Sequence, residues 1–382
     1  MKNFLVNAAV CLISLLLFLA LIEFSFQQNA VHKWVKFKAH QTDVSEVFPL
    51  DPLPPAVIEA GRKQFSSPNY DAVSWNALDA RMEEVKYSVD PYPATFLIKK
   101  KRGEHNAVTI REEIKLGQDD FISTVYTMDG EHIRKSASRP YDKQKKNLLL
   151  LGCSIAFGMN LPDTETIPAH LAEAFPAMNV YNLGVPGDGI TNILDDIYLN
   201  DRIANINKKG GAAIYIYFQG HFRRHFPGLE FFRRNSQPWS REYSVSNGQL
   251  VATEPGGLEK IEMLLLKWLS KSDFLYATGW GYNAFSRANQ EMFRDYLVYI
   301  RDFYRTRYDM DFYLYVMNPD DLPSRWLYDE LTARGIKVIL HESLYNHFAN
   351  FELLIPADGH PSNRGAYLIS RLIEARLRRD GL

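Results

Sequence analysis

The stretch that decides the fold is Asn147-Leu148-Leu149-Leu150-Leu151-Gly152-Cys153-Ser154-Ile155-Ala156-Phe157-Gly158. A short apolar run of strand length ends in Gly-Cys-Ser, and a helical stretch follows a few residues later. This order places Ser154 at the carboxyl edge of a buried strand. Open α/β sheets carry their chemistry at that edge, and a serine nucleophile needs such a position to reach a substrate. On this stretch alone, ordinary turn chemistry after a buried strand is the better explanation.

From residue 146 onward, strand-like runs alternate with helical stretches, which is typical of a parallel sheet with crossover helices. After the first strand, the sequence predicts strands at 179–184, 212–218, 312–317 and 336–340. It predicts helices at 166–175, 190–204, 287–306 and 324–333, and a last helix that contains Leu368, Leu372 and Ile373. We therefore expect a doubly wound, flavodoxin-like α/β/α fold with a parallel sheet over residues 146–382.

Length, charge and cysteine content limit the classes of protein to consider. The chain has 382 residues, more than the roughly 100–200 of one compact domain, so an accessory region beside the core is expected. A formal net charge of −1 creates no global field that would attract nucleic acid. Cys11 lies in the N-terminal apolar segment and Cys153 beside the candidate nucleophile, so a disulfide between them is implausible.

The N-terminal segment 4–26 is almost wholly apolar, and a helix needs roughly 20 such residues to cross a bilayer. A cleaved signal peptide is the alternative, but Gln28-Asn29-Ala30 is a poor cleavage site. We therefore expect residues 1–28 to form an uncleaved signal anchor. The orientation is open at this point, because Lys33, Lys36 and Lys38 follow the span and would place the next domain inside the cell by the positive-charge rule.

Two further regions surround the core. Residues 29–145 begin with a proline-rich linker and contain strand-like runs at 94–98 and 121–127, so a small β-rich accessory region without chemistry of its own is expected. A long insertion is expected at about 222–286. It contains a helical stretch with four apolar residues at core spacing, namely Ile261, Leu264, Leu265 and Trp268.

Polar groups follow three successive core strands and should therefore meet at one edge of the sheet. Ser154 follows the first strand, Gly187 lies in the loop after the second, and His221 follows the third. Far along the chain, Asp358 and His360 stand two residues apart. In an extended loop, such a carboxylate can orient the imidazole, which then activates Ser154 as a general base.

This arrangement resembles the SGNH (GDSL-like) hydrolase family over residues 146–382. The segment 152–158 is similar to the first family block, Gly-Asp-Ser-x-x-x-Gly, with Cys153 in place of the aspartate. The segment 182–187 is similar to the second block, whose glycine N–H helps form the oxyanion hole. Asp358-Gly359-His360-Pro361 is similar to the last block, and its Asp-x-His spacing is similar to that of SGNH-like O-acetyltransferases of exopolysaccharide biosynthesis.

The resemblance implies an SGNH-hydrolase fold with Ser154 as nucleophile, His360 as base and Asp358 as the group that orients His360. It also implies an oxyanion hole made by the Ser154 and Gly187 N–H groups. The third family block, Gly-x-Asn-Asp, is the weakest match, because Gln219-Gly220-His221 stands there and His221 takes the place of the asparagine. A neutral imidazole N–H can still donate to an oxyanion.

Each of these residues also has a structural explanation. Ser154 could cap a helix, the segment 358–360 could be a helix-entry turn, and His221 could be a buried core histidine. His221 and His225 have the i, i+4 spacing of a metal pair on a helix, but no third ligand stands out, so no metal and no cofactor are expected. Arg223, Arg224, Arg233 and Arg234 form a basic cluster that is either a solvated face or a site for an anionic glycan or phosphate.

The function expected from these residues and the resemblance is that of a serine-dependent esterase acting on an acylated carbohydrate. O-acetyl transfer to a surface polysaccharide is the alternative, as is a catalytically silent carbohydrate-binding or assembly protein of the same fold. The resemblance and the apolar segment 4–26 together imply a single-pass protein of the bacterial inner membrane, with its catalytic domain in the periplasm. Polysaccharide-assembly proteins are the expected partners, and no nucleic-acid partner is expected.

Overall fold

The computed structural model describes residues 48–62, 83–88, 95–102, 108–115, 121–129, 133–136, 141–187, 189–199, 202–226, 242–246, 248–253, 264–272, 285–355 and 359–382. The predicted anchor 1–28 lies outside these described residues, and so do Ile261, Arg233, Arg234 and Asp358. Among the helices of the described residues, none combines the length and the apolar character that a bilayer crossing requires.

A five-stranded sheet with the order β11-β10-β7-β5-β6 forms the centre of the molecule. Every neighbouring pair in it is parallel. Counted along the chain from β5, this order is 2-1-3-4-5, the flavodoxin-like arrangement. The predicted fold class is therefore confirmed. The strands are β5 (Lys146–Gly152), β6 (Met178–Asn182), β7 (Gly211–Tyr217), β10 (Met310–Val316) and β11 (Lys337–Ile339).

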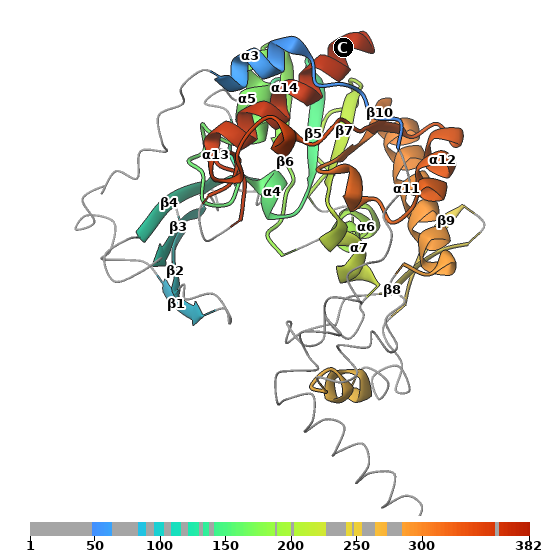
Figure 1. The fold of residues 1–382 in the computed structure, drawn as a ribbon, viewed down its shortest axis with the longest axis horizontal. Coiled ribbons are helices and arrows are strands. Elements are labelled where there is room, and N and C mark those ends of the chain that lie inside the picture. Colours follow the sequence, from blue (N-terminus) through green and yellow to red (C-terminus); the bar gives the residue numbers. More distant parts are fainter. Residues whose placement is uncertain are drawn as a thin grey trace, which may run out of the picture.

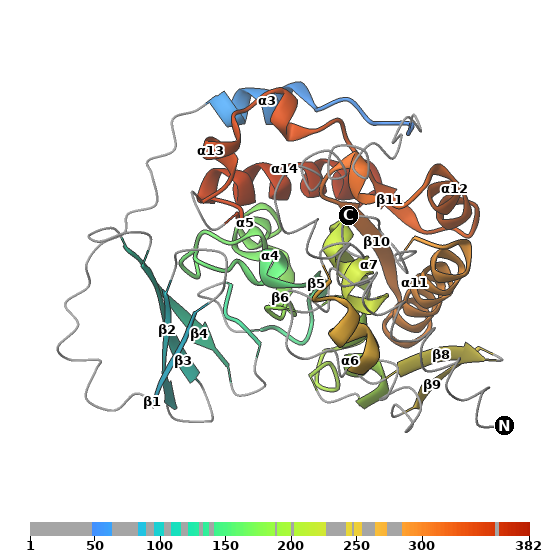
Figure 2. The ribbon, with the colours of Figure 1, turned by 60° about the horizontal axis from the view of Figure 1, so that its bottom comes forward.

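Helices cover both faces of this sheet and create two separate apolar cores. Successive residues of β5 alternate between them, since Leu149 and Leu151 belong to one core and Leu148 and Leu150 to the other. The first core receives α6 (Ile190–Leu199), α11 (Arg287–Tyr308) and α12 (Arg325–Ala333). The second receives α3 (Pro55–Arg62), α5 (Ile167–Ala174) and α14 (Asn363–Arg379). Figures 1 and 2 show the resulting three layers.

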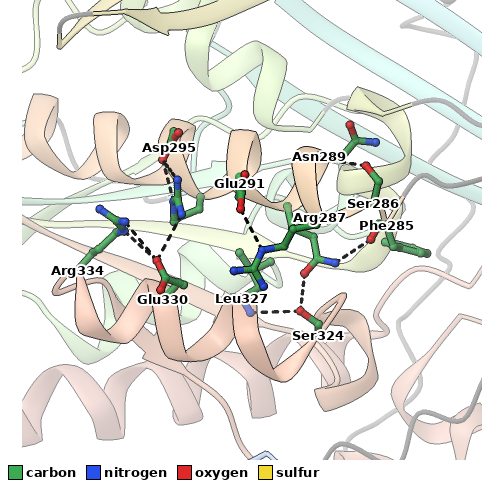
Figure 3. A network of polar contacts seen from close by, with 12 residues as sticks. Phe285, Ser286, Arg287, Asn289, Glu291, Asp295, Ser324, Leu327, Glu330 and Arg334 are labelled. Atoms are coloured by element: carbon green, nitrogen blue, oxygen red, sulfur yellow. Dashed lines mark hydrogen bonds and ion pairs between the residues drawn. The ribbon is translucent and has the colours of Figure 1, made fainter.

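A polar network fixes α12 against α11 beside the first core (Figure 3). The Gln290 side chain donates to Phe285 O and accepts from the Ser324 hydroxyl, whose oxygen also caps α12 by accepting from Leu327 N. One turn further along, Glu330 forms ion pairs with Arg294 and Arg334. Because Gln290 is buried, these hydrogen bonds satisfy polar groups that would otherwise be costly.

Two antiparallel sheets lie outside the central one. The strands β1 (Glu83–Ser88), β2 (Thr95–Arg102), β3 (Val108–Lys115) and β4 (Phe121–Met128) pair in chain order, and the predicted strand-like runs at 94–98 and 121–127 fall in β2 and β4. A hairpin of β8 (Glu242–Ser246) and β9 (Gln249–Thr253) lies within the insertion. Isolated bridges join Arg134 to Met128 and to Asn182, so the end of β4 is connected to the edge strand β6.

Some predicted elements differ from the observed ones. The helix expected at 190–204 ends at Leu199, and Ile203 is buried instead through a contact in which its carbonyl accepts from the Tyr308 hydroxyl. The insertion does contain a helix at 264–269, but Leu264, Leu265 and Trp268 are exposed and do not form the expected core face. Apolar spacing alone does not say which surface a short helix covers.

Several short elements were not expected at all. They are α4 (Ser154–Phe157), α7 (Gln219–His225), α13 (Asn350–Leu353) and the 3-10 turns Pro319–Asp321 and Leu344–Asn346. Each is too short to show an apolar periodicity, and α7 is mostly polar. Two of them, α4 and α7, nevertheless follow directly on core strands and build the candidate site.

Candidate active site

Ser154 is the first residue of α4, immediately beyond the end of β5. Residues 147–152 of β5 are all buried, so the strand holds this turn rigidly at the carboxyl edge of the sheet. The helix has only four residues and ends at Gly158, which adopts the left-handed conformation and donates to the carbonyls of Ser154 and Ile155. Ser154 is 7% exposed, so most of the residue is buried.

His360 stands against the Ser154 hydroxyl. The distance between His360 Nε2 and Ser154 Oγ is 2.8 Å, within hydrogen-bond reach. His360 is positioned by a tight return of the chain, in which Ile355 N donates to His360 O and Leu354 bridges to Pro361. Ser362 then caps α14 by accepting from Gly365 N. The structure therefore brings together two of the residues that the sequence singled out.

The third member of the predicted triad, Asp358, lies outside the described residues. Its role in orienting His360 stays a prediction from the sequence. The neighbouring Gly359 is described, is exposed and has a φ of +81°. Gly359 itself therefore adopts a conformation that favours glycine.

Cys153 acts as the N-cap of α4. Its Sγ accepts from Ile155 N at 3.5 Å, as the oxygen of an N-capping side chain would. The Ser154 hydroxyl also lies 3.7 Å from the same sulfur. Cys153 is fully buried, so the turn has a capping acceptor that solvent does not reach.

The segment 182–187 packs against residues 153–161, which carry Ser154 and are called the nucleophile turn below. The Asn182 side chain donates to Phe157 O at 3.0 Å and accepts from Gly184 N at 3.1 Å. Gly184 is in such close contact with α4 that a Cβ there would lie 2.8 Å from Phe157 Cα. Gly187 is exposed with a φ of +86°, and a Cβ there would meet nothing within 4 Å. The loop thus has space beside Gly187, where the sequence predicted close approach of a ligand.

His221 lies in α7 and is completely buried. Its Nδ1 is 2.8 Å from the Tyr215 hydroxyl, and the two rings stack. Burial, reinforced by the charge of Arg224, holds the pKa of His221 well below its usual range, so the ring is neutral. A neutral ring can donate a hydrogen bond, as the predicted role requires. The ring lies behind the residues that line the pocket beside Ser154. Its part in an oxyanion hole stays a prediction.

A pocket of about 240 Å³ opens beside Ser154 and His360. Within the described part of the chain, neither Gly187 nor His221 contributes to its wall. Of the predicted arginines, Arg224 lines it, whereas Arg223 lies against the Phe285 ring instead. The other lining residues are Ile155, Phe218, Met317, Asn318, Asp321, Tyr345, Leu354, Gly359 and Pro361.

Three polar residues of this wall, Asn318, Asp321 and Tyr345, were missed by the sequence reading. Asn318 and Asp321 follow β10 directly, so the rule that placed Ser154 at the carboxyl edge of the sheet could have placed them too. Tyr345 stands in a short turn after β11 and carries no comparable signal.

Asp321 connects two walls of the pocket. Its carboxylate accepts from Gln219 N at 3.1 Å, at the start of α7, and from Asn318 N at 3.0 Å. Burial raises the pKa of Asp321 from 3.8 to about 6, although the two backbone donors act in the opposite direction. Its charge therefore changes within one pH unit of neutrality.

No metal centre is evident among the residues that the structure describes, where His, Cys, Asp and Glu form no group of three suited to a metal ion. His221 and His225 do share a helix, as their spacing suggested, but each has its own neutral partner. His225 Nδ1 lies 2.9 Å from the Thr191 hydroxyl, and burial lowers the pKa of His225 to about 4.

Comparisons with known proteins give fold likenesses only. No family model matches the chain, and no curated protein matches it. One similar solved structure is assigned to the G-D-S-L family of lipolytic proteins, from Desulfitobacterium hafniense DCB-2, with a TM-score of 0.37 and 12% identity over 61% of this chain and 99% of that chain. Another is a member of the lipolytic G-D-S-L family from Veillonella parvula DSM 2008, with a TM-score of 0.34 and 12% identity over 61% of this chain and 99% of that chain.

Proposed function

We propose that this protein is a serine-dependent ester hydrolase in which Ser154 is the nucleophile and His360 the general base. The observation that carries this proposal is the 2.8 Å contact between His360 Nε2 and Ser154 Oγ beside an open pocket. A serine that only capped a helix would need no imidazole at its hydroxyl. A nucleophilic serine does need one, because its hydroxyl is a weak nucleophile until a base accepts its proton.

In the proposed reaction, His360 takes the proton of Ser154 as Oγ attacks the acyl carbon of an ester. The tetrahedral intermediate collapses when His360 passes that proton to the departing alcohol oxygen, which leaves an acyl-serine. Water, activated by the same imidazole, then releases the acid and restores Ser154. The Ser154 N–H, at the first position of α4, is suited to stabilise the oxyanion, and the Gly187 N–H is the second proposed donor.

The substrate that we propose is an acylated carbohydrate at the cell envelope. The pocket combines aromatic and polar groups, with Phe218 and Tyr345 beside Asn318 and Asp321, and such a lining suits the faces and hydroxyls of a sugar. Arg224 adds a cation to the wall and favours a substrate with an anionic group. The apolar segment 4–26 supports a membrane-tethered protein, and the resemblance to enzymes of exopolysaccharide biosynthesis favours the periplasmic side for this domain.

Acyl transfer to a sugar hydroxyl is the second candidate, and the Asp358-Gly359-His360 spacing favours it. The two reactions share the acyl-serine and differ only in the acceptor that resolves it. The shape of the pocket and the exclusion of water decide between them.

The test uses the full chain purified in detergent and incubated with an activated acetyl ester. We expect an acetyl adduct on Ser154 by mass spectrometry and turnover that falls at least about a thousandfold in Ser154→Ala and His360→Gln. Because these two groups act as one unit, the double variant should lose no more than either single variant. An added oligosaccharide acceptor then distinguishes transfer from hydrolysis by whether acetyl reaches sugar or water.

Two results would count against this enzymatic function. Normal folding with glycan binding, but with neither adduct nor turnover, would favour the catalytically silent protein. Unchanged turnover in Ser154→Ala would place the chemistry elsewhere.

A further inference from the structure

Arg134 is the largest residue among the fully buried side chains of the described part, and it lies directly behind the nucleophile turn. It comes from the short segment after β4, within the region expected to be accessory. A fully buried guanidinium is costly unless its donors are paired. Its contacts therefore show what the fold gains from placing it there.

Three backbone carbonyls of the nucleophile turn accept from this guanidinium. Arg134 Nη1 donates to Phe157 O and to Gly158 O, each at 2.6 Å, and Nη2 donates to Leu161 O at 2.6 Å. A helix leaves its last carbonyls without intrahelical partners, and α4 is only one turn long. Arg134 supplies partners to this carboxyl end, where a positive charge is also favoured by the helix dipole.

The guanidinium itself is held on its other sides. Its Nε donates to Asp163 Oδ1 at 3.0 Å, and Asp163 also accepts from the N–H of Thr127 in β4. The Tyr126 and Phe157 rings lie 4.6 and 4.7 Å from its central carbon, close enough for cation–π attraction. The planar fork can thus point in only one direction, toward the turn.

A short hydrogen-bonded path leads from Arg134 to the nucleophile. The Ser154 carbonyl accepts from Gly158 N and Met159 N, both at 2.9 Å, so the backbone of Ser154 is tied to the segment that Arg134 holds. The opposite side of Phe157 O accepts from Asn182 Nδ2. Moving the carbonyls at 157–161 would therefore rotate α4 and shift Ser154 Oγ relative to His360.

We propose that Arg134 is a positioning residue that fixes the Ser154 turn in the geometry needed for attack. It touches neither the pocket nor the reacting atoms, and it acts through the backbone of α4. This inference rests on the proposed function of Ser154. It gives the segment around β4 a role in positioning the active site, in addition to its place in the fold.

The test compares Arg134→Lys with a matched control in the full chain. Lysine keeps the charge but cannot reach three carbonyls and a carboxylate with one ammonium. Arg202→Lys is the control, because Arg202 pairs with Asp196 at 3.1 Å with side chains only 16% and 9% exposed, away from the pocket. The measurements are the labelling rate of Ser154 by a fluorophosphonate, kcat and KM for an ester, the melting temperature, and hydrogen–deuterium exchange of residues 153–161.

We expect Arg134→Lys to slow labelling of Ser154 by roughly tenfold or more, since small misplacements of a reacting group have large effects on rate. The loss should appear in kcat with KM nearly unchanged, and exchange in 153–161 should become faster. The control Arg202→Lys should change neither the labelling rate of Ser154 nor the exchange of residues 153–161. Equal labelling rates in the two variants, or losses that only follow the melting temperature, would overturn the proposal.

Two further outcomes keep the inference separate from folding and from the proposed function. If Arg134→Lys does not fold, Asp163→Asn keeps Arg134 and removes only its ion pair, and a loss of a few-fold in labelling is expected. No loss there would count against the proposal. If the wild-type protein is never labelled, the proposed function fails, and the exchange of residues 153–161 alone decides whether Arg134 holds the turn.

Discussion

At the scale of single residues, Cys153 caps α4 although cysteine is an unusual residue at an N-cap. Its sulfur accepts from Ile155 N, so it fulfils the capping requirement of α4 while remaining fully buried. The sulfur is a weak acceptor, and the proton of Ser154 has a better destination in His360 Nε2. The role of Cys153 is therefore expected to be structural.

This assignment predicts a stability effect without a rate effect. Cys153→Ala removes the cap and leaves a small void, and should lower the free energy of unfolding by about 1–2 kcal/mol. Cys153→Ser keeps an acceptor and should lose less. Urea unfolding measures both, and fluorophosphonate labelling of Ser154 should remain within a few-fold of wild type. A large fall in labelling at unchanged stability would instead give the thiol a part in the chemistry.

Asp321 predicts a pH dependence of stability. Because its pKa is raised from 3.8 to about 6, the folded state binds this proton more tightly than the unfolded state. The stabilising contribution is therefore complete below about pH 4 and is lost as the pH rises through about 6. Asp321→Asn cannot ionise, so the difference in urea midpoint between wild type and variant should shift against the wild type between pH 4 and 7. Parallel pH profiles for the two proteins would contradict this.

At the scale of elements, the loop after β6 performs two tasks through two glycines. Gly184 allows the loop to touch the backbone of α4, whereas Gly187 sits in open space with a positive φ. The same substitution at each should thus act differently. Sequence spacing could not separate these roles, since both residues belong to one family-like block.

Gly184→Ala should destabilise the protein by about 1–3 kcal/mol through overpacking and should slow labelling of Ser154, because the new methyl group pushes on α4. Gly187→Ala has room for its methyl group, so its cost should be limited to the roughly 1–2 kcal/mol of a left-handed backbone. Thermal unfolding and labelling of both variants provide the comparison. A larger loss of thermal stability in Gly187→Ala than in Gly184→Ala would reverse the two assignments.

Elements with a strong pattern could be predicted, and elements made by tertiary contact could not. The apolar runs located all five core strands, the strand-edge rule led to Ser154, and the Asp-x-His spacing with the family resemblance led to His360. The one-turn helix α4 has no periodicity to detect. Tyr345 in the pocket wall also has no signal in the sequence, because it lies beside Ser154 only once the sheet has formed.

At the scale of the whole molecule, the segment 48–62 precedes the α/β domain in the sequence but contributes side chains to its core. Asp51 N donates to Leu340 O and Asp51 O accepts from Glu342 N, so Asp51 pairs with the chain just beyond the end of β11. Leu53 and Val57 are then buried in the second core with α14. The region before the α/β core is therefore required for part of the core itself.

Truncation should reveal this requirement. A chain that lacks residues 1–47 keeps Leu53 and Val57 and should unfold close to the temperature of the full chain. A chain that lacks residues 1–62 loses both, at about 1.5–3 kcal/mol for each fully buried side chain, and should be clearly less stable. Leu53→Ala in the shorter truncation is the control. Equal stability of the two truncated chains would show that the segment adds nothing to the core.

The same segment has a consequence for the order in which the protein is made. The hydrogen bond from Leu53 N to the Glu342 side chain joins residues 289 positions apart. At typical ribosomal speeds of about 5–20 residues per second, Leu53 is synthesised roughly 15–60 seconds before its partner exists. During that interval the hydrogen bond from Leu53 N and the packing against α14 cannot form, so full burial of this early segment depends on residues that are made last. A chain whose synthesis stops before α14 would leave Leu53 and Val57 without the packing that this helix provides.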